Sequence, residues 1–517
     1  MRPTLIGDFH GDRPSPGIVS AAKKAGGEST YAKKRKFEAT PEPPAAIDEG
    51  GDLDPLVAEP GPSFVIQQHY ATRLHHDFRL EMSRPGGEAV LVSWAVPKGL
   101  PRRRGVKALA VRTEDHPFAY GTFSGSIPGG NYGAGQVRIF DSGTYETVKR
   151  DEEKLTFRLR GNRLQGIYHI VKTGAENGKE QWLAIMSEDQ RPTPDARPPL
   201  DPMLATLVDD PFDDPEWSFE PKWDGIRALA VCDEKTELLS RLGNSITGGY
   251  PELAGLHDRL VALDAIVDGE IVSIVNGTAS FQRLQQRMHV RDKAQLATLA
   301  RKVPVTFMAF DLIYLDGKNL VTERLEKRRR LLEEIVVPDD TIQVSPAISG
   351  EGTALFQAAE EQGLEGIVAK RISSIYEPGK RSPNWLKIKT ILDLDAVVVG
   401  WTEGSGARQG TLGSLVLALY EDDGSLRYVG NLGTGFNAAS LKDAMDRLKK
   451  LKSSASPFDA GVIKSRPELR KAHWVKPALV AIVEYRQLTN AGRLRAPAFK
   501  GFREDKDPKS CTVAQLA

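Results

Sequence analysis

The 517-residue sequence predicts a multidomain α+β protein with a β-barrel or sandwich near its N-terminus, a central domain of helices and strands, and a second strand-rich domain at its C-terminus. Three observations support this prediction. Short apolar runs separated by Gly-rich turns extend from residue 64 to about 189, helical and strand patterns alternate to about 390, and strand patterns return from 392. The length is sufficient for several domains, each with its own core.

The first 62 residues predict a flexible basic arm. They are rich in Gly, Pro, Lys and Glu and carry almost no periodic apolar signal, as in "AAKKAGGESTYAKKRKFEATPEPPAA". Such a segment is either disordered or lies over a neighbouring domain.

Residues 63–190 predict a small all-β domain. The expected strands include "FVIQQHYA", "AVLVSWAV", "ALAVRTE", "GQVRIFDSGTYE", "KLTFRLRG" and "QWLAIMS", with turn residues at the intervals typical of a sandwich or barrel. Residues 191–200 follow as a Pro-rich linker.

Residues 201–390 predict the mixed domain, with a helix in "TERLEKRRRLLEEIV" and a strand in "VTFMAFDLIYL". Residues 391–517 begin with strands such as "DAVVVGWTEG" and "SLVLALYEDDG" and then become basic. From Lys442 to Ala517 there are 17 Lys and Arg against 8 Asp and Glu, although the whole chain has a net charge of only +1. This local excess indicates a surface for a polyanion; a solvated helix face around "DRLKKLKSS" would explain part of it.

Cysteine content and hydropathy limit the class of protein. Cys232 and Cys511 are the only cysteines, which argues against disulfide scaffolds and zinc knuckles and fits a reducing compartment. The N-terminus has no apolar signal-like segment, and no stretch is long enough to span a membrane. We therefore expect a soluble, cytoplasmic protein.

The stretch "FEPKWDGIRALA", residues 219–230, places charged side chains at the start of an apolar run. In an extended chain, Lys222 and Asp224 would point into one cleft while Trp223 points away. A lysine beside a carboxylate can act as an amine nucleophile once it is deprotonated. The ordinary alternative is a solvated edge lysine or an ion-pair partner, because four residues of this kind recur by chance.

Further polar residues recur downstream at the ends and on one face of predicted strands. In "WLKIK", Leu386 and Ile388 would face a core, while Trp385, Lys387 and Lys389 would line the opposite face, which suits a triphosphate. The other candidates are Arg241 in "SRLGN", Glu270 in "DGEIV", Phe310 in "FDLIYLDG", and Glu365 with Lys370 in "EGIVAKR". Taken singly, most of these would be surface salt-bridge residues.

In this order and spacing, the segments resemble the nucleotidyl-transferase motifs of ATP-dependent DNA ligases. The resemblance implies an ATP-grasp-like adenylation domain in which Lys222 attacks the α-phosphate of ATP and becomes a lysine–AMP adduct, with Asp224 also at the catalytic centre. It implies that Glu220 reads the adenine amino group and Phe310 stacks on the ring. The remaining implied roles are ribose and phosphate contacts for Arg227, Arg241 and Glu270, a magnesium or manganese ligand for Glu365, and charge neutralisation of the α-phosphate for Lys387 and Lys389.

The closing stretch "RAPAFKGFREDK" resembles the last ligase motif, which is carried on an oligonucleotide-binding (OB) fold. By that resemblance Arg503, Asp505 and Lys506 orient pyrophosphate as the leaving group. RNA ligases and mRNA capping enzymes share the same lysine chemistry. NAD-dependent ligases normally add a four-cysteine zinc module, which two distant cysteines cannot form.

The stretch "HYATRLHHDFRLE" predicts a metal site in the N-terminal domain. Two imidazoles and a carboxylate, from His69, His75 and Asp77, suit a divalent transition metal such as manganese or zinc. Arg79 would reach the same strand face and could bind a phosphate. His116 and Tyr120 in "EDHPFAYG" could add an acid or a phosphate ligand; the alternative is a set of unrelated core and surface histidines.

This region resembles the 3′-phosphoesterase module of bacterial ligase D. The resemblance implies manganese on His69, His75 and Asp77, and phosphate contacts from Arg79, Lys98, His116 and Tyr120. It also implies that the arm folds over the site through Arg35 and Glu42. The sequence departs from the family pattern in two places: Lys36 stands where an acid is usual, and Ala108 stands where a phosphate-binding arginine is usual, with Lys107 as a candidate substitute.

Together these features predict an enzyme that heals 3′ ends and then seals nicks or breaks in DNA with ATP and a divalent metal. The resemblance implies DNA as the partner, a place at the nucleoid, and a monomer that works with Ku and a separate polymerase rather than a fused one. The alternatives are an RNA ligase and an end-binding scaffold with an inactive phosphoesterase fold; labelling with α-labelled ATP distinguishes an active ligase from a scaffold.

Overall fold

The computed structural model describes residues 30–35, 37–44, 54–55, 62–83, 89–275, 278–288, 290, 292–390, 392–404, 411–485, 487–489 and 491–516. Most of the predicted arm, and Lys36 in it, lies outside the described residues. The chain forms two compact units, residues 1–192 and 193–517, which are described separately.

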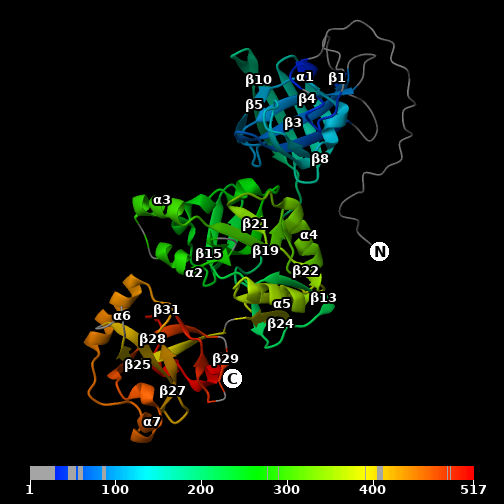
Figure 1. The fold of residues 1–517 in the computed structure, drawn as a ribbon. Coiled ribbons are helices and arrows are strands. Elements are labelled where there is room, and N and C mark those ends of the chain that lie inside the picture. The colour runs from blue at the N-terminus through cyan, green and yellow to red at the C-terminus, as the bar shows by residue number, and fades with distance from the viewer. Residues whose placement is uncertain are drawn as a thin grey trace. The chain divides into compact units, whose positions relative to one another are not determined.

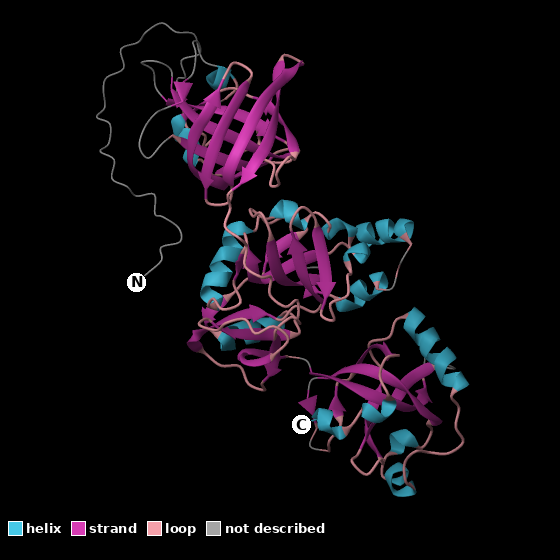
Figure 2. Cartoon of the chain, turned by 180° about the vertical axis from the view of Figure 1, so that it is seen from behind, coloured by secondary structure: helices cyan, strands magenta, loops and turns pink. Residues whose placement is uncertain are grey.

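The first unit is a closed barrel of eight antiparallel strands (Figures 1 and 2). The ring runs β3-β2-β8-β9-β10-β11-β5-β4 and closes where β4 pairs with β3. Its strands are β2 (Ser63–Tyr70), β3 (Leu74–Ser83), β4 (Ala89–Val96), β5 (Lys107–Arg112), β8 (Gly135–Arg150), β9 (Lys154–Gly161), β10 (Gln165–Glu176) and β11 (Lys179–Asp189). The all-β prediction is confirmed, as a barrel rather than a sandwich; β10 was missed.

Alternation along β3 separates the core of this barrel from its outer face. Phe78 and Leu80 are fully buried, and Phe78 stacks on Phe157 of β9, which is not a neighbouring strand. Even-numbered residues of β3 therefore fill the interior, and Asp77 and Arg79 point outward. Two short helices, α1 (Thr30–Lys33) and η1 (Phe118–Thr122), place Tyr31 and Tyr120 beside His116 near that outer face. The short strands β1 (Asp54–Pro55), β6 (His116–Pro117) and β7 (Gly125–Ile127) pair with β3, β4 and β8.

The second unit begins with two sheets that pack on one another, as the α+β prediction requires. One has the order β12-β24-β23-β13-β22, with β12 (Leu204–Leu207), β13 (Asp214–Pro221), β22 (Ile348–Gly350), β23 (Gly366–Arg371) and β24 (Arg381–Lys389). The other has the order β15-β14-β16-β19-β20, and β21 also pairs with β19. Its strands are β14 (Ile226–Cys232), β15 (Thr236–Ser240), β16 (Ala265–Val272), β19 (Thr306–Leu315), β20 (Lys318–Asn319) and β21 (Ile342–Val344).

A shared core joins the two sheets: Leu229, Ile266 and Phe310 come from one sheet, and Trp385 comes from the other. A small ribbon and four helices complete this region: β17 (Ile274–Val275), β18 (Thr278–Ala279), α2 (Phe281–Leu284), α3 (Lys293–Lys302), α4 (Leu325–Ile335) and α5 (Gly352–Glu361). The helix and strand predicted from residues 322–336 and 305–315 are confirmed as α4 and β19.

The C-terminal part of this unit is β-rich, as predicted, with the sheet order β27-β26-β25-β28-β31. Its main elements are β25 (Leu392–Glu403), β26 (Leu412–Tyr420), β27 (Leu426–Leu432), α6 (Ala438–Lys450), α7 (Ala460–Lys464), β28 (His473–Tyr485) and β31 (Ala498–Arg503), with a short ribbon of β29 (Gln487–Leu488) and β30 (Leu494–Arg495). A bridge from Thr434 to Ala498 brings the chain after β27 beside β31, at the other edge of the sheet.

The Pro-rich linker packs on the second unit. The backbone N–H of Asp195 donates to the carbonyl of Gly317 at 2.8 Å, and its carboxylate accepts from the backbone N–H of Asn319 at 3.0 Å. None of the helices in the part of the chain that the structure describes is long and apolar enough to cross a membrane.

Candidate active sites

Lys222 lies in the loop where the chain crosses from one sheet of the second unit to the other. Strand β13 ends at Pro221 and β14 begins at Ile226, and the Lys222 backbone N–H donates to the carbonyl of Gly366 at 2.8 Å. Only glycine fits at position 225, because a Cβ there would lie 2.2 Å from the carbonyl oxygen of Ile271. Residues 222–224 are not part of a strand, but Lys222 and Asp224 line one pocket, as predicted. Trp223 does not line that pocket: its indole donates to Ser345 Oγ at 2.9 Å, and it lines a separate one.

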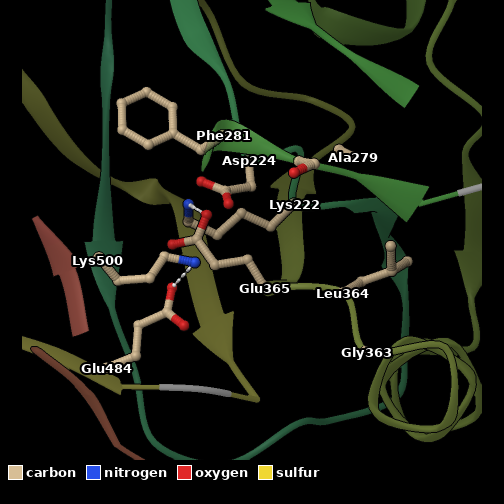
Figure 3. Close-up of a pocket in the computed structure, with 10 residues that line it drawn as sticks. Lys222, Asp224, Ala279, Phe281, Gly363, Leu364, Glu365, Glu484 and Lys500 are labelled. Atoms are coloured by element: carbon tan, nitrogen blue, oxygen red, sulfur yellow. Dashed lines mark hydrogen bonds and ion pairs between the residues drawn. The ribbon is translucent and has the colours of Figure 1, made fainter. Parts of the chain in front are cut away.

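The Lys222 ammonium group binds a carboxylate. Its Nζ forms an ion pair with Glu365 Oε2, and Lys389 Nζ lies 3.4 Å from the other oxygen of the same carboxylate. Burial opposes ionisation of Glu365, but the two lysines outweigh it and lower its pKa. Lys222, Asp224 and Glu365 line one pocket (Figure 3). Burial and the Glu365 charge raise the pKa of Asp224.

Lys222 also lines a second pocket of about 230 Å³, which lies between the two sheets. This pocket contains six other residues that the ligase resemblance singled out: Glu220, Arg227, Arg241, Glu270, Phe310 and Lys387. Trp385 is 1% exposed and forms part of its wall beside Phe310. Lys387 and Trp385 share a face as predicted, but Trp385 is buried because that face packs against the other sheet.

The charged side chains of this pocket include Arg227, Lys387 and Glu270. Arg227 makes a bidentate ion pair with the buried Asp268, at 2.6 Å from each nitrogen, and its guanidinium lies 4.5 Å from the centre of the Phe310 ring. Burial, together with the charges of Lys389 and Lys222, lowers the pKa of Lys387 to about 8. Burial raises the pKa of Glu270 to about 8, although Arg227 and Lys222 favour its ionised form.

Glu220 is held by two cations that the sequence did not identify as its partners. Its Oε1 accepts from Lys370 Nζ at 2.9 Å and from Arg329 at 3.4 Å. Lys370 is 2% exposed, and its Nζ lies 4.3 Å from the centre of the Phe310 ring. Burial lowers the pKa of Lys370, and Glu220 opposes that effect. This ion pair fixes the carboxylate at the edge of the pocket.

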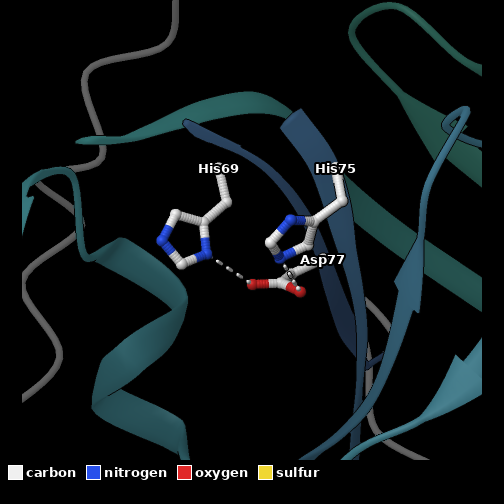
Figure 4. Close-up of side chains that lie close together, drawn as sticks. All are labelled: His69, His75 and Asp77. Atoms are coloured by element: carbon white, nitrogen blue, oxygen red, sulfur yellow. Dashed lines mark ion pairs between the residues drawn. The ribbon is translucent and has the colours of Figure 1, made fainter. Parts of the chain in front are cut away.

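The first unit brings His69, His75 and Asp77 together on the outer face of its barrel (Figure 4). One ligand atom from each residue lies within 4.8 Å of the others. His69 Nδ1 is 3.7 Å from Asp77 Oδ2, and His75 Nε2 is 3.6 Å from Asp77 Oδ1. The two histidines are opposite one another in the β2–β3 register, which explains why this pattern meets in space.

The other nitrogen of each histidine faces a backbone carbonyl. His69 Nε2 is 2.8 Å from the Gly133 carbonyl, and His75 Nδ1 is 3.0 Å from the Arg73 carbonyl. As donors to these carbonyls, both rings would present an unprotonated nitrogen toward Asp77, as metal-ligating histidines do. Burial disfavours ionisation of Asp77, but Arg79 and the two histidines hold its pKa below the usual range. The donor set therefore fits a divalent transition metal.

Arg79 is directed by three side chains on this face. It donates to Asp77 at 2.9 Å, to Gln67 at 2.7 Å and to Ser93 at 2.7 Å. It is 2% exposed and lines a cavity of about 730 Å³ together with the metal cluster, His116 and Tyr120. Burial, with help from Arg79 and Arg35, holds the pKa of His116 well below its usual value.

The described part of the arm packs against this cavity. Arg35 donates to Glu42 at 2.8 Å, and its Nη2 lies 3.3 Å from His116 Nε2. Glu42 also accepts from the Tyr120 hydroxyl at 3.2 Å. The structure thus brings Arg35 and Glu42 to the site, as the resemblance implied.

Three other residues of the phosphoesterase resemblance do not reach the cavity. Among the described residues, Lys98 and Lys107 are exposed, and neither they nor Ala108 line it. Lys107 cannot replace the arginine expected at position 108, because neighbouring residues of β5 point to opposite faces of the sheet. Among the described residues, the lysine and arginines that line the cavity are Arg35, Arg73, Arg79 and Lys179.

Comparison with known proteins gives the family. Three family models match in order: the DNA ligase D 3′-phosphoesterase domain over residues 67–172, the ATP-dependent DNA ligase domain over 202–389, and the ATP-dependent DNA ligase C-terminal region over 408–506. DNA ligase C of Mycobacterium tuberculosis is 33% identical over 62% of this chain and 94% of its own length. The chain belongs to the ATP-dependent DNA ligases.

The chain is also similar to end-joining proteins of the ligase D type. It is 38% identical to the multifunctional non-homologous end joining protein LigD of Mycolicibacterium smegmatis over 97% of this chain, and it spans 63% of that relative's length. A solved structure of mycobacterial DNA ligase D complexed with ATP and MES is 34% identical and covers 60% of this chain and 98% of that chain, with a TM-score of 0.48.

The three residues assigned to the last ligase motif lie outside both Lys222 pockets, although Lys500 of the same stretch lines the first pocket. Arg503 and Lys506 both bind Asp395 of β25, at 3.2 and 2.7 Å, and Asp505 pairs with Arg503 at 3.0 Å. None of the three is among the described residues that line those pockets. Sequence reasoning also missed Asp268 and Arg329. The available signal for Asp268 was an acidic residue in the middle of the apolar strand "AIVDGEIV", two residues before Glu270.

Proposed function

We propose that this ligase activates itself at Lys222 with ATP and then seals nicks in duplex DNA. The observation that carries the proposal is the position of Lys222 Nζ, which contacts Glu365 and lines both pockets. In the first step a bond forms between Nζ and the α-phosphorus as the bond to pyrophosphate breaks. Glu365 is placed to accept the proton that Nζ loses.

The other nucleotide contacts follow the ligase motifs. Glu220 reads the adenine amino group and Phe310 stacks on the ring, while Arg227, Arg241 and Glu270 hold the ribose and phosphates. Lys387 and Lys389 neutralise charge at the α-phosphate. Glu365, whose carboxylate contacts Lys222 and Lys389, would hold a magnesium or manganese ion, and that ion would supply positive charge beside the phosphates.

Labelling with α-labelled ATP tests the lysine assignment. The full chain should take up label with magnesium or manganese and lose it to pyrophosphate, and Lys222→Ala should take up none. Lys235→Ala is the matched control, since this exposed lysine lies in the turn between β14 and β15. Persistent labelling of Lys222→Ala would remove the assignment.

We also propose that the N-terminal barrel releases phosphate from 3′-phosphate ends of DNA. His69, His75 and Asp77 would hold manganese, which as a Lewis acid supplies positive charge at the terminal phosphate. Arg79 balances phosphate charge, and His116 and Tyr120 face the same cavity. Because Ala108 replaces an expected arginine and Lys107 lies outside the cavity, we expect slow turnover.

Phosphate release from a 3′-phosphate primer tests this second activity. Manganese should support it better than magnesium, because imidazole ligands favour the transition metal. His75→Ala should abolish release and leave AMP labelling at Lys222 intact. His169→Ala, which alters a histidine bound to Thr156 on the same barrel, should keep both activities. No release by the wild-type chain with manganese would make the barrel a docking module.

Together the two activities suit double-strand break repair by end joining, with Ku and a separate polymerase as partners of a monomeric enzyme at the nucleoid. In this proposal residues 63–190 form the phosphoesterase, 201–390 the ATP-grasp-like adenylation domain, and 391–517 an OB-fold. The link between Thr434 and Ala498 supports the OB-fold, because it brings the two edges of the sheet together. Sealing of RNA in preference to DNA would favour the RNA-ligase alternative.

A further inference from the structure

Tyr132 is an exposed aromatic residue inside the phosphoesterase cavity. Its side chain is 46% exposed, yet it lines the same cavity as His69, His75 and Asp77. The other residues around the metal cluster are mostly polar or charged. A ring that is left open in such a cavity offers a flat apolar surface to a ligand.

The backbone around Tyr132 is tied to the metal cluster. The carbonyl of the next residue, Gly133, lies 2.8 Å from His69 Nε2. Two backbone hydrogen bonds tighten the loop: Asn131 N–H donates to the Pro128 carbonyl at 3.3 Å, and Ala134 N–H donates to the Asn131 carbonyl at 3.2 Å. The backbone of Tyr132 is therefore held one residue from the carbonyl that contacts a candidate metal ligand.

The arm places two cationic side chains beside the same ring, and both also pair with carboxylates: Lys34 with Glu114 at 3.0 Å and Arg35 with Glu42 at 2.8 Å. Lys34 Nζ lies 4.9 Å from the ring centre of Tyr132, and the Arg35 guanidinium carbon lies 5.7 Å from it. The Asn131 side chain donates to the carbonyl of Ala39 at 3.2 Å, which joins the arm to the loop. Cations and an aromatic ring side by side are the combination that binds a phosphate together with the base next to it.

The cavity is also larger than a phosphate requires. Its volume of about 730 Å³ falls within the range of sites that take small organic ligands. We propose that Tyr132 is the stacking platform for the nucleobase of the terminal nucleotide that carries the 3′-phosphate. The barrel would thus bind a nucleoside 3′-phosphate end as a unit, with little preference among bases because every base has a flat face. This inference rests on the phosphoesterase function proposed above.

The test compares two primers that differ only at the 3′ end: one ends in a normal nucleoside 3′-phosphate, and the other in an abasic 3′-phosphate. With manganese, the wild-type full chain should show a KM about tenfold lower for the primer with the base, which is the size of one base–aromatic stack. Tyr132→Ala should raise KM for that primer about tenfold and leave KM for the abasic primer nearly unchanged. Tyr132→Phe should behave as wild type.

Phe118→Ala is the matched control, because Phe118 is an aromatic residue of the same barrel with similar exposure, 47%, and lies outside the cavity lining. It should not change either KM. Equal losses of Tyr132→Ala on both primers would overturn the platform and make Tyr132 a support for the loop. Equal KM values of the wild-type chain for the two primers would also overturn the platform.

A binding measurement separates failure of the platform from failure of the proposed activity. A primer that carries 2-aminopurine as its terminal 3′-phosphorylated nucleotide should lose fluorescence on binding to wild type with manganese, because stacking quenches it. Tyr132→Ala should restore much of that signal at saturating protein, and Phe118→Ala should not. Quenching that is unchanged in Tyr132→Ala contradicts the platform, whether or not phosphate is released.

Discussion

Lys387 and Glu270 are the two groups of the nucleotide pocket with pKa values near 8, and both change the pocket charge in the same direction. As pH rises through 8, Lys387 loses a positive charge and Glu270 gains a negative one. Each change disfavours the phosphates of ATP. Affinity for a non-cleavable ATP analogue should therefore fall about tenfold or more between pH 7 and pH 9.

Binding titrations at several pH values measure this effect. Lys387→Arg should flatten the profile, because a guanidinium stays charged throughout this range. Glu270→Gln should remove the second contribution. A wild-type profile that is level to pH 9 would mean that neither group titrates in the free enzyme near 8.

Lys370 is expected to act through Glu220 rather than on ATP itself. Lys370 and Arg329 both bind Oε1 of Glu220, so Oε2 is the oxygen that we expect to face the ligand. That oxygen would accept from the adenine amino group. Wild type should then prefer ATP about tenfold over purine riboside triphosphate, which lacks that amino group.

Lys370→Met should remove most of the preference for ATP over purine riboside triphosphate, because it releases the Glu220 carboxylate from its fixed position. AMP labelling with saturating ATP should fall by a smaller factor. Arg371→Gln, next to it but exposed and paired with Glu216, is the matched control. Measuring labelling with both nucleotides gives the ratio. A preference that survives in Lys370→Met would show that Glu220 does not need this partner.

At the level of elements, the sequence predicted strands best where one face is apolar and the other polar. Strand β10 was missed because Ile167, Tyr168, Ile170 and Val171 place apolar side chains on both faces and hide the alternation. Spacing along a strand correctly grouped His75, Asp77 and Arg79. It also grouped Lys222 with Asp224 in one pocket, although these residues lie in a loop between two sheets and not in a strand.

Contacts between distant elements were beyond sequence reasoning. The ion pair from Lys370 to Glu220 and the packing of the loop at Tyr132 beside the arm depend on which strands become neighbours. The residue types were visible in the sequence, but which of them come into contact depends on the order of the strands in the sheets. The resemblance to ligase D supplied the arm contacts of Arg35 and Glu42 that the residues alone did not.

The end of α6 is the element most suited to the phosphate backbone of DNA. Lys449, Lys450 and Lys452 are exposed, and in the described part of the chain they form no ion pair. If they contact phosphates, replacing all three by Gln should reduce the salt dependence of nick binding by about one unit of log–log slope for each contact. Titrations of a labelled nicked duplex at several salt concentrations measure that slope.

Arg447→Gln is the control on the same helix, because Asp443 and Glu504 already bind that arginine at 2.9 Å. The salt dependence of nick binding by Arg447→Gln should have the same slope as that of the wild-type protein. A slope that is unchanged in the triple variant would leave these lysines as a solvated helix face, which was the alternative from the sequence.

At the scale of the whole molecule, order and composition predicted the sequence of domains well. The barrel, the α+β region and the C-terminal β-rich region were each visible in the periodicity of the sequence. The position of the last ligase motif relative to ATP could not be predicted from the sequence. Local patterns say nothing about how a domain docks during one step of a reaction. In the structure Arg503 and Lys506 of that motif bind Asp395 of β25, while Lys500 of the same stretch lines a Lys222 pocket.

This placement predicts a division of labour between two steps. If Lys506 orients pyrophosphate, it must leave Asp395 and reach the ATP pocket during self-adenylylation, and the domain must move away before DNA binds. Lys506→Ala should lower AMP labelling at least about tenfold but change sealing of a pre-adenylylated nick by less than about twofold. Lys509→Ala, an exposed lysine three residues later, should change neither step. Equal losses in both steps for Lys506→Ala would show that the motif stays at the active site throughout, and the proposed domain movement would then be wrong.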